Sequence, residues 1–170
     1  MPRLAAIADC IDRIIAVIGR IAAWGVLVVV LVEFTVVLLR YGFGIGSIWL
    51  QESILYAHAA LFLMAAAWTL REGGHVRVDV FYAGASPRTR AWIDLLGALF
   101  LLLPFCFAIV VFSLPYVARS WAILERSRET SGLPLVFVLK TLIPGFAALM
   151  LLQGASLAIR AGLTLADEPR

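Results

Sequence analysis

The sequence predicts an all-α integral membrane protein with four transmembrane helices, an N-terminal amphipathic helix in the membrane interface, and both termini in the cytoplasm. Three observations predict this fold class. Of the 170 residues, 63% are hydrophobic and only 15% are charged, whereas a soluble domain is about half apolar and a quarter charged. Four apolar runs approach the ~20 residues with which a helix crosses a bilayer. Lys and Arg are also distributed unevenly between the two sides of these runs.

The first predicted element is an amphipathic helix over residues 4–20. Its apolar residues recur at the i, i+3, i+4, i+7 spacing of one helix face, and its charged residues avoid that face. Such a helix can lie in the membrane interface. The alternative is that it simply continues the next helix. The apolar stripe consists of Leu4, Ile7, Ala8, Ile11, Ile14, Ile15 and Ile18.

Four transmembrane helices follow within a single membrane domain, residues 1–170. The first apolar run starts later and is longer than the core of a cleaved signal peptide, and no clear cleavage site follows it. We therefore expect it to be retained as a helix. The predicted spans are residues 21–39, 53–70, 93–118 and 141–160.

The orientation follows from the basic residues in the flanks of the spans. Nine of the 14 Lys and Arg residues lie on the side of the two termini and five lie on the other side. Because cytoplasmic flanks carry the excess of Lys and Arg, the termini are predicted to be cytoplasmic. The loop over residues 71–92 is then cytoplasmic, and the loop over residues 119–140 is periplasmic.

Two of the polar residues inside the apolar runs are candidates for contacts within the membrane. Glu33 is a carboxylate in the first run, and an acid within a membrane span is a functional hypothesis by default. It could couple transport to a proton or cation. The favoured interpretation is a structural acid that pairs with a base or with a polar group of a partner subunit. Gln153 lies deep in the fourth run, where we expect its side chain to bond to another helix.

No constellation of catalytic residues is evident in the sequence. His58 and His75 lie toward opposite ends of the second run, so they cannot bind one haem iron between them. Cys10 and Cys106 form no motif with the spacing of metal ligands. The scattered bases form no basic run, which gives no support to nucleic-acid binding. We therefore expect neither an enzyme nor a cofactor-binding protein.

Three motifs in a fixed order resemble a known family. They are Trp49-Leu50-Gln51-Glu52 at the start of the second span, Gly-His-Val-Arg-Val-Asp at 74–79, and Ser-Pro-Arg-Thr-Arg at 86–90 before the third span. Together with the chain length and the four spans, this order resembles the small membrane subunit of tripartite ATP-independent periplasmic (TRAP) transporters, the DctQ-like family. The resemblance covers nearly the whole chain.

The resemblance implies a non-catalytic scaffold subunit in the bacterial inner membrane. Its partners would be a large DctM-like membrane subunit, a DctP-like periplasmic binding protein and membrane lipids. The large subunit would hold the substrate and sodium sites for secondary transport, in which a sodium symport imports organic anions (carboxylates). No cofactor is expected in this chain. The alternative function is a self-sufficient, proton-coupled four-helix exporter with Glu33 as its coupling acid.

The resemblance also assigns roles to individual residues. The motif residues would be structural or would contact a partner subunit, and the periplasmic loop would help to dock the binding protein. The motif residues are Trp49, Glu52, His75, Arg77 and Asp79; the docking residues are Arg119, Glu125, Arg126, Arg128 and Glu129.

Overall fold

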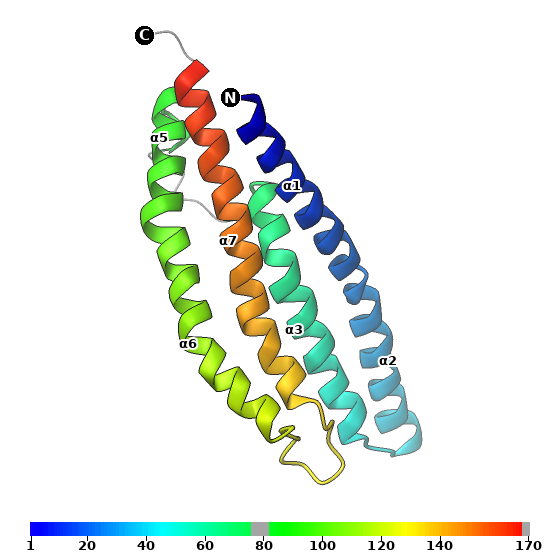
Figure 1. Cartoon of the computed structure of the whole chain (residues 1–170). Helices are drawn as coiled ribbons and strands as arrows, with labels where there is room; N and C mark the ends of the chain where they lie inside the picture. The colour runs from blue at the N-terminus through cyan, green and yellow to red at the C-terminus, as the bar shows by residue number, and fades with distance from the viewer. Residues whose placement is uncertain (76–81, 168–170) are drawn as a thin grey trace.

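The computed structural model of the chain describes residues 1–75 and 82–167, and all the regular secondary structure within these ranges is helical. Short connections separate most of the helices, and a longer loop joins the last two (Figure 1). The elements are α1 (Pro2–Ala23), α2 (Gly25–Phe43), α3 (Ile48–Arg71), α5 (Pro87–Gly97), the π-helical turn η1 (Ala98–Leu102), α6 (Leu103–Ala122) and α7 (Val136–Asp167).

Four stretches of the described chain are long and apolar enough to cross a membrane, as predicted. They are α1 with α2, then α3, then α5 through α6, and finally α7. Figure 1 shows the N-terminus, the start of α5 and the last turns of α7 at one end of the bundle, here called the terminal end. The α2–α3 turn and the α6–α7 loop lie at the opposite end, here called the loop end.

The helices extend beyond the predicted apolar runs because polar residues cap and continue them. The Ser47 side chain caps α3 by accepting a hydrogen bond from the Leu50 backbone N–H at 3.4 Å. Ser86 caps α5 in the same way, accepting from Thr89 N–H at 3.2 Å. Gly44 ends α2 with a φ of 71°, a left-handed conformation that costs glycine little. The last part of the loop predicted over residues 71–92 is therefore helical, because α5 begins at Pro87.

A π-helical turn carries the third span past Pro104. Within η1 the Leu103 backbone N–H donates to the Ala98 carbonyl, five residues earlier. Proline has no N–H of its own, and its ring clashes with the carbonyl four residues before it. The wider turn accommodates both effects, so that α5, η1 and α6 form one continuous span.

The N-terminal helix α1 continues almost directly into α2, separated from it only by Trp24. It packs against α3 and α7, and Figure 1 shows α1 and α2 following each other along the bundle. Residues 4–20 therefore lie in a helix that leads directly into the next helix, which was the alternative to a separate interfacial helix. A location in the membrane interface stays a prediction.

The buried face of α1 differs from the predicted apolar stripe. It consists of Ala8, Asp12, Ile15 and Gly19, which are spaced four, three and four residues apart. Small and polar residues occupy this face because they allow close approach and hydrogen bonds between helices, which drive packing in membranes. Larger stripe residues lie outside the contact and are about half exposed. They are Leu4, Ile7 and Ile14.

The core of the bundle lies around α7, which contacts α1, α3, α5 and α6. It contains several small side chains, as is usual between membrane helices. Both cysteines are free: Cys10 is exposed and Cys106 is buried. The central cluster is formed by Ile15, Ala67, Cys106, Ala147 and Met150.

We predict that Gly19→Ala destabilises the bundle, because Gly19 lies directly against Trp68 of α3. An added Cβ would lie 2.3 Å from the Trp68 Cβ, so α1 would have to move away from α3. The expected loss is about 1–3 kcal/mol in the free energy of unfolding, measured in detergent micelles. As a control, Gly162→Ala on α7 meets no atom within 4 Å and should be at least as stable as the wild type, because Ala favours a helix over Gly. Equal unfolding of the two variants would contradict the close contact.

Candidate functional site

A cluster of polar side chains joins α1 to α7 within the terminal half of the bundle. The Asp12 carboxylate accepts hydrogen bonds from Ser156 Oγ at 2.7 Å and from Gln153 Nε2 at 3.2 Å. Its other oxygen accepts from Arg160 Nε at 2.9 Å and from Arg160 Nη2 at 2.5 Å. Arg160 also forms an ion pair with Asp9 Oδ1 at 2.8 Å. We call these five residues the Asp12 cluster.

The Asp12 cluster is buried where it joins the two helices and open at its rim. Asp12, Gln153 and Ser156 are buried, whereas the side chains of Asp9 and Arg160 are about half exposed. A buried carboxylate is costly without partners, and here donors from α7 reach both of its oxygens. Gln153, predicted to bond to another helix, donates to Asp12. The cluster thus fixes the position of α1 along α7.

Glu52 binds the α6–α7 loop at the loop end of the bundle. Its carboxylate accepts from the Leu133 backbone N–H at 2.6 Å and from the Ser127 hydroxyl. The Ser127 backbone N–H in turn donates to the Leu133 carbonyl at 3.2 Å. A side chain at Gly132 would collide with both Ser127 and Glu52. The motif residue Glu52 therefore acts as an anchor that shapes this loop.

Glu125 ties the same loop to α6 and α7. Its carboxylate accepts from Lys140 Nζ at 2.5 Å and from Ser120 Oγ at 2.6 Å. These two bonds hold the pKa of Glu125 below its ordinary value. The Lys140 ammonium also lies 4.1 Å from the centre of the Tyr116 ring, a cation–π contact. Glu125, predicted to dock a partner, thus has its carboxylate engaged within the chain.

The other predicted docking residues lie on the surface of the loop end. Arg119 is exposed at the end of α6, and Arg126, Arg128 and Glu129 are exposed on the loop. Leu124 adopts a φ of 45°, which is unusual for a residue with a side chain and turns the chain sharply after α6. The loop therefore presents guanidinium groups outward while Glu52 and Glu125 hold its inner side.

The two other motif residues that the structure describes, Trp49 and His75, lie at opposite ends of α3. Trp49 is 52% exposed near the start of α3, and His75 is exposed after α3. Arg77 and Asp79 lie outside the described residues. The structure therefore does not bring the two halves of the motif together: Trp49 lies at the loop end and His75 follows the opposite end of α3.

Glu33 lies on the exposed side of α2, facing an open groove of about 460 Å³ between α2 and α3. The same groove is lined by His58, Gln51 and Arg40. Among the described residues, none forms a hydrogen bond or ion pair with the side chain of Glu33 or His58. Nor does any group of three or more His, Cys, Asp or Glu side chains in the described ranges lie close enough to bind a metal ion.

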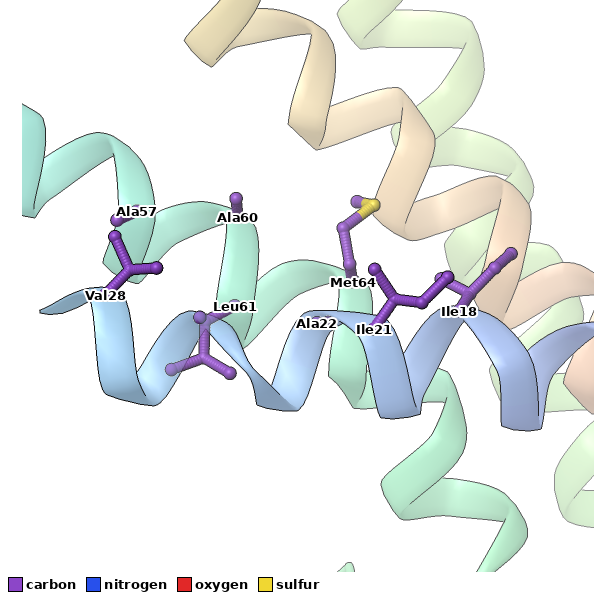
Figure 2. A pocket seen from close by; sticks show the side chains of 9 residues that line it. Ile18, Ile21, Ala22, Val28, Ala57, Ala60, Leu61 and Met64 are labelled. Carbon is purple, nitrogen blue, oxygen red and sulfur yellow. The ribbon is translucent and has the colours of Figure 1, made fainter.

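A second groove, of about 390 Å³, has an almost entirely apolar lining. Figure 2 shows it where α1 passes into α2 beside α3, with Ile18, Ile21 and Val28 on one side and Ala57 and Met64 on the other. Hydrocarbon chains can fill such a groove without leaving a polar group unpaired. The two grooves therefore differ in what can cover them: acyl chains suit the apolar groove, whereas the groove with Glu33 also needs polar partners.

Sequence reasoning missed Asp12 and the partners of Glu52. The apolar stripe predicted for residues 4–20 leaves Asp12, like the other charged residues there, on the opposite side of the helix. Yet Asp12 lies four residues after Ala8 and three before Ile15, which is the spacing of a packed helix face. That spacing is a signal which the sequence contains. The contacts of Glu52 with residues 127 and 133 depend on the fold of an irregular loop, so no periodic pattern in the sequence predicts them.

We predict that Asp12→Ala destabilises the protein far more than Asp9→Ala, although both acids contact Arg160. Removing Asp12 leaves Ser156, Gln153 and Arg160 without their shared acceptor, at a cost of about 1–3 kcal/mol or more. Asp9 makes one exposed ion pair, worth about 0–1 kcal/mol. Thermal unfolding of both variants in one detergent compares them directly. Similar losses would show that the buried bonds do not hold α1.

The model of the family described as "Tripartite ATP-independent periplasmic transporters, DctQ component" matches residues 16–162. This range includes Gly19 of α1, the Glu52 anchor, the α6–α7 loop and the α7 side of the Asp12 cluster. No curated protein and no solved structure matches the chain.

Proposed function

Because this chain belongs to the DctQ component family of tripartite ATP-independent periplasmic transporters, we propose that it is the scaffold subunit of such a transporter. Membership makes it a transporter component rather than an enzyme, and a multi-pass protein of the inner membrane. The tripartite system implies a large membrane subunit and a periplasmic binding protein as its partners. In our proposal this chain holds the large subunit in the bilayer and helps to dock the binding protein.

One observation supports a scaffold role most directly: the best-bonded acids of this chain join its own segments. Asp12 joins α1 to α7, Glu52 joins α3 to the α6–α7 loop, and Glu125 joins that loop to α6 and α7. Groups engaged in this way brace a bundle, whereas substrate sites keep convergent polar groups open to a cavity. We therefore place the transported substrate outside this chain.

The finer features of the proposal follow from the family relationship. The large subunit would be DctM-like and would hold the sodium ions and an organic anion such as a carboxylate. The binding protein would be DctP-like. This chain would need no cofactor. The exporter alternative, with Glu33 as a coupling acid, has no support from the family match.

We propose that the terminal end of the bundle faces the cytoplasm. Of the Lys and Arg residues that the structure describes, seven lie on the side of this end and five on the side of the loop end. Figure 1 shows the N-terminus and the last turns of α7 at the terminal end. The excess of Arg favours the cytoplasmic side under the positive-inside rule. The α6–α7 loop would then face the periplasm, where the binding protein is.

The proposed function is tested by co-purification of the chain from native membranes in mild detergent, followed by mass spectrometry. We expect a large multi-span permease at equal stoichiometry, because a scaffold must remain bound to what it supports. A chain that purifies alone, and that transports a cation by itself in liposomes, would overturn the proposal.

The orientation predicts how the native cysteines react with a membrane-impermeant maleimide. In right-side-out vesicles, Cys10 should stay unlabelled until the membrane is permeabilised, because it is exposed at the terminal end. Cys106 should stay unlabelled until the protein unfolds, because it is buried. Arg128→Cys in a Cys10→Ser background should react at once. Immediate labelling of Cys10 would show the opposite orientation.

For docking, we predict that the double variant Arg126→Ala/Arg128→Ala lowers uptake at limiting binding-protein concentration by roughly 3- to 10-fold. The loss should be recovered when more binding protein is added, because exposed charges chiefly change the rate of association. Arg88→Ala, an exposed arginine of α5 at the terminal end, is the matched control and should leave uptake unchanged. Equal uptake by the double variant and the control would argue against docking at this loop.

A further inference from the structure

The helix α2 is the peripheral member of the bundle. It packs along α3 and touches α1 near their junction, and it is the only helix in the described ranges without a buried residue. Phe34 is 65% exposed, and Val30 and Leu31 are 56% exposed. Lipid could cover these apolar side chains without loss. An apolar face alone would therefore say nothing about a partner.

The polar lining of the α2–α3 groove changes this conclusion. Glu33 lies seven residues before Arg40, which places it ~10 Å from Arg40 along the helix and within the apolar span. His58 faces the same groove from α3, and both side chains are exposed. Hydrocarbon offers no hydrogen-bond donor, so an acid at this depth needs a partner.

Asp12 and Glu33 differ in the partners that the described residues of this chain supply. Donors from Ser156, Gln153 and Arg160 surround the Asp12 carboxylate. Glu33, by contrast, has no hydrogen bond or ion pair to any described residue. Within its described residues, the chain therefore supplies partners for the buried acid Asp12 and leaves Glu33, an acid within an apolar span, unpaired on an exposed surface.

We propose that the α2–α3 groove receives a transmembrane helix of the large membrane subunit, which places a cationic or hydrogen-bond-donating side chain against Glu33. This inference rests on the proposed scaffold function and names the surface that carries it out. The lining of the groove also predicts other side chains on the partner helix. A hydrogen-bond acceptor on the partner helix would lie near Arg40 and His58. Apolar side chains of the partner helix would cover the exposed apolar residues of α2.

The groove of Figure 2 gives a contrast within the same helices. Its lining is nearly all apolar, so acyl chains satisfy it as well as protein does. Of these two grooves, the one with Glu33 and His58 demands a partner with polar groups at a defined depth. The polar pair thus selects a protein helix over lipid as the occupant.

The first test is site-specific photo-crosslinking in native membranes that contain the whole transporter. A photoreactive residue replaces Leu55, which lines the groove and is 57% exposed. The control position is Phe112 on α6, which is 80% exposed and away from the groove. We expect a strong crosslink from position 55 to the large subunit and a weaker one from position 112. Crosslinks from position 55 to lipid only, or to a second copy of this chain, would overturn the proposal.

The second test compares Glu33→Leu with Thr35→Leu, an exposed polar residue of α2 that does not line the groove. Glu33→Leu should lower the amount of co-purified large subunit by roughly tenfold or more, as expected when one member of a desolvated pair is removed. Thr35→Leu should have little effect. Both isolated variants should unfold at the wild-type temperature.

The outcomes separate this inference from the proposed function. If the wild-type chain retains the large subunit and Glu33→Leu retains it equally, the groove assignment is wrong and the scaffold function stands. If the wild-type chain does not retain the large subunit, both are wrong. Strong loss with Glu33→Leu and intermediate loss with Glu33→Gln would support a donor that approaches this side chain.

Discussion

The structure depends above all on the bonds that the Asp12 carboxylate makes with α7. A charged group inside a membrane bundle must find donors there or destabilise the fold, and Ser156, Gln153 and Arg160 supply them. To reach these donors, α1 has to lie along α7. The contact of Gly19 with Trp68 then follows, because only a residue without a side chain allows α1 to approach α3 so closely.

The loop end of the bundle is held by a second set of acids. Glu52 fixes the loop through the backbone N–H of Leu133 and the Ser127 hydroxyl, and Glu125 binds Lys140 on α7. Both ends of the bundle are thus braced by its own side chains, as a static support requires. The helix α2 takes no part in this bracing, which leaves its outer surface and Glu33 for another subunit.

The sequence predicted the architecture better than it predicted the contacts. Length and hydropathy identified the four spans, because each crossing needs a long apolar helix whatever its neighbours are. They did not reveal that Asp12 is buried, because apolar periodicity marks the residues that avoid water and not the side that meets another helix. The motif identified Glu52 but not its partners, since these lie on a loop about 80 residues away in the chain. Arg77 and Asp79, in the same motif, lie outside the described residues.

The measurement that tests the scaffold most directly is a pair of spin labels, one on native Cys10 of α1 and one on Ala122→Cys at the loop end of α6, in the reconstituted transporter. The distance distribution between them is recorded with and without sodium, substrate and binding protein. A static support predicts the same distribution in every condition, because Asp12, Glu52 and Glu125 hold the bundle at both ends. A shift of several ångströms during transport would show that this chain moves with the substrate and would contradict the account.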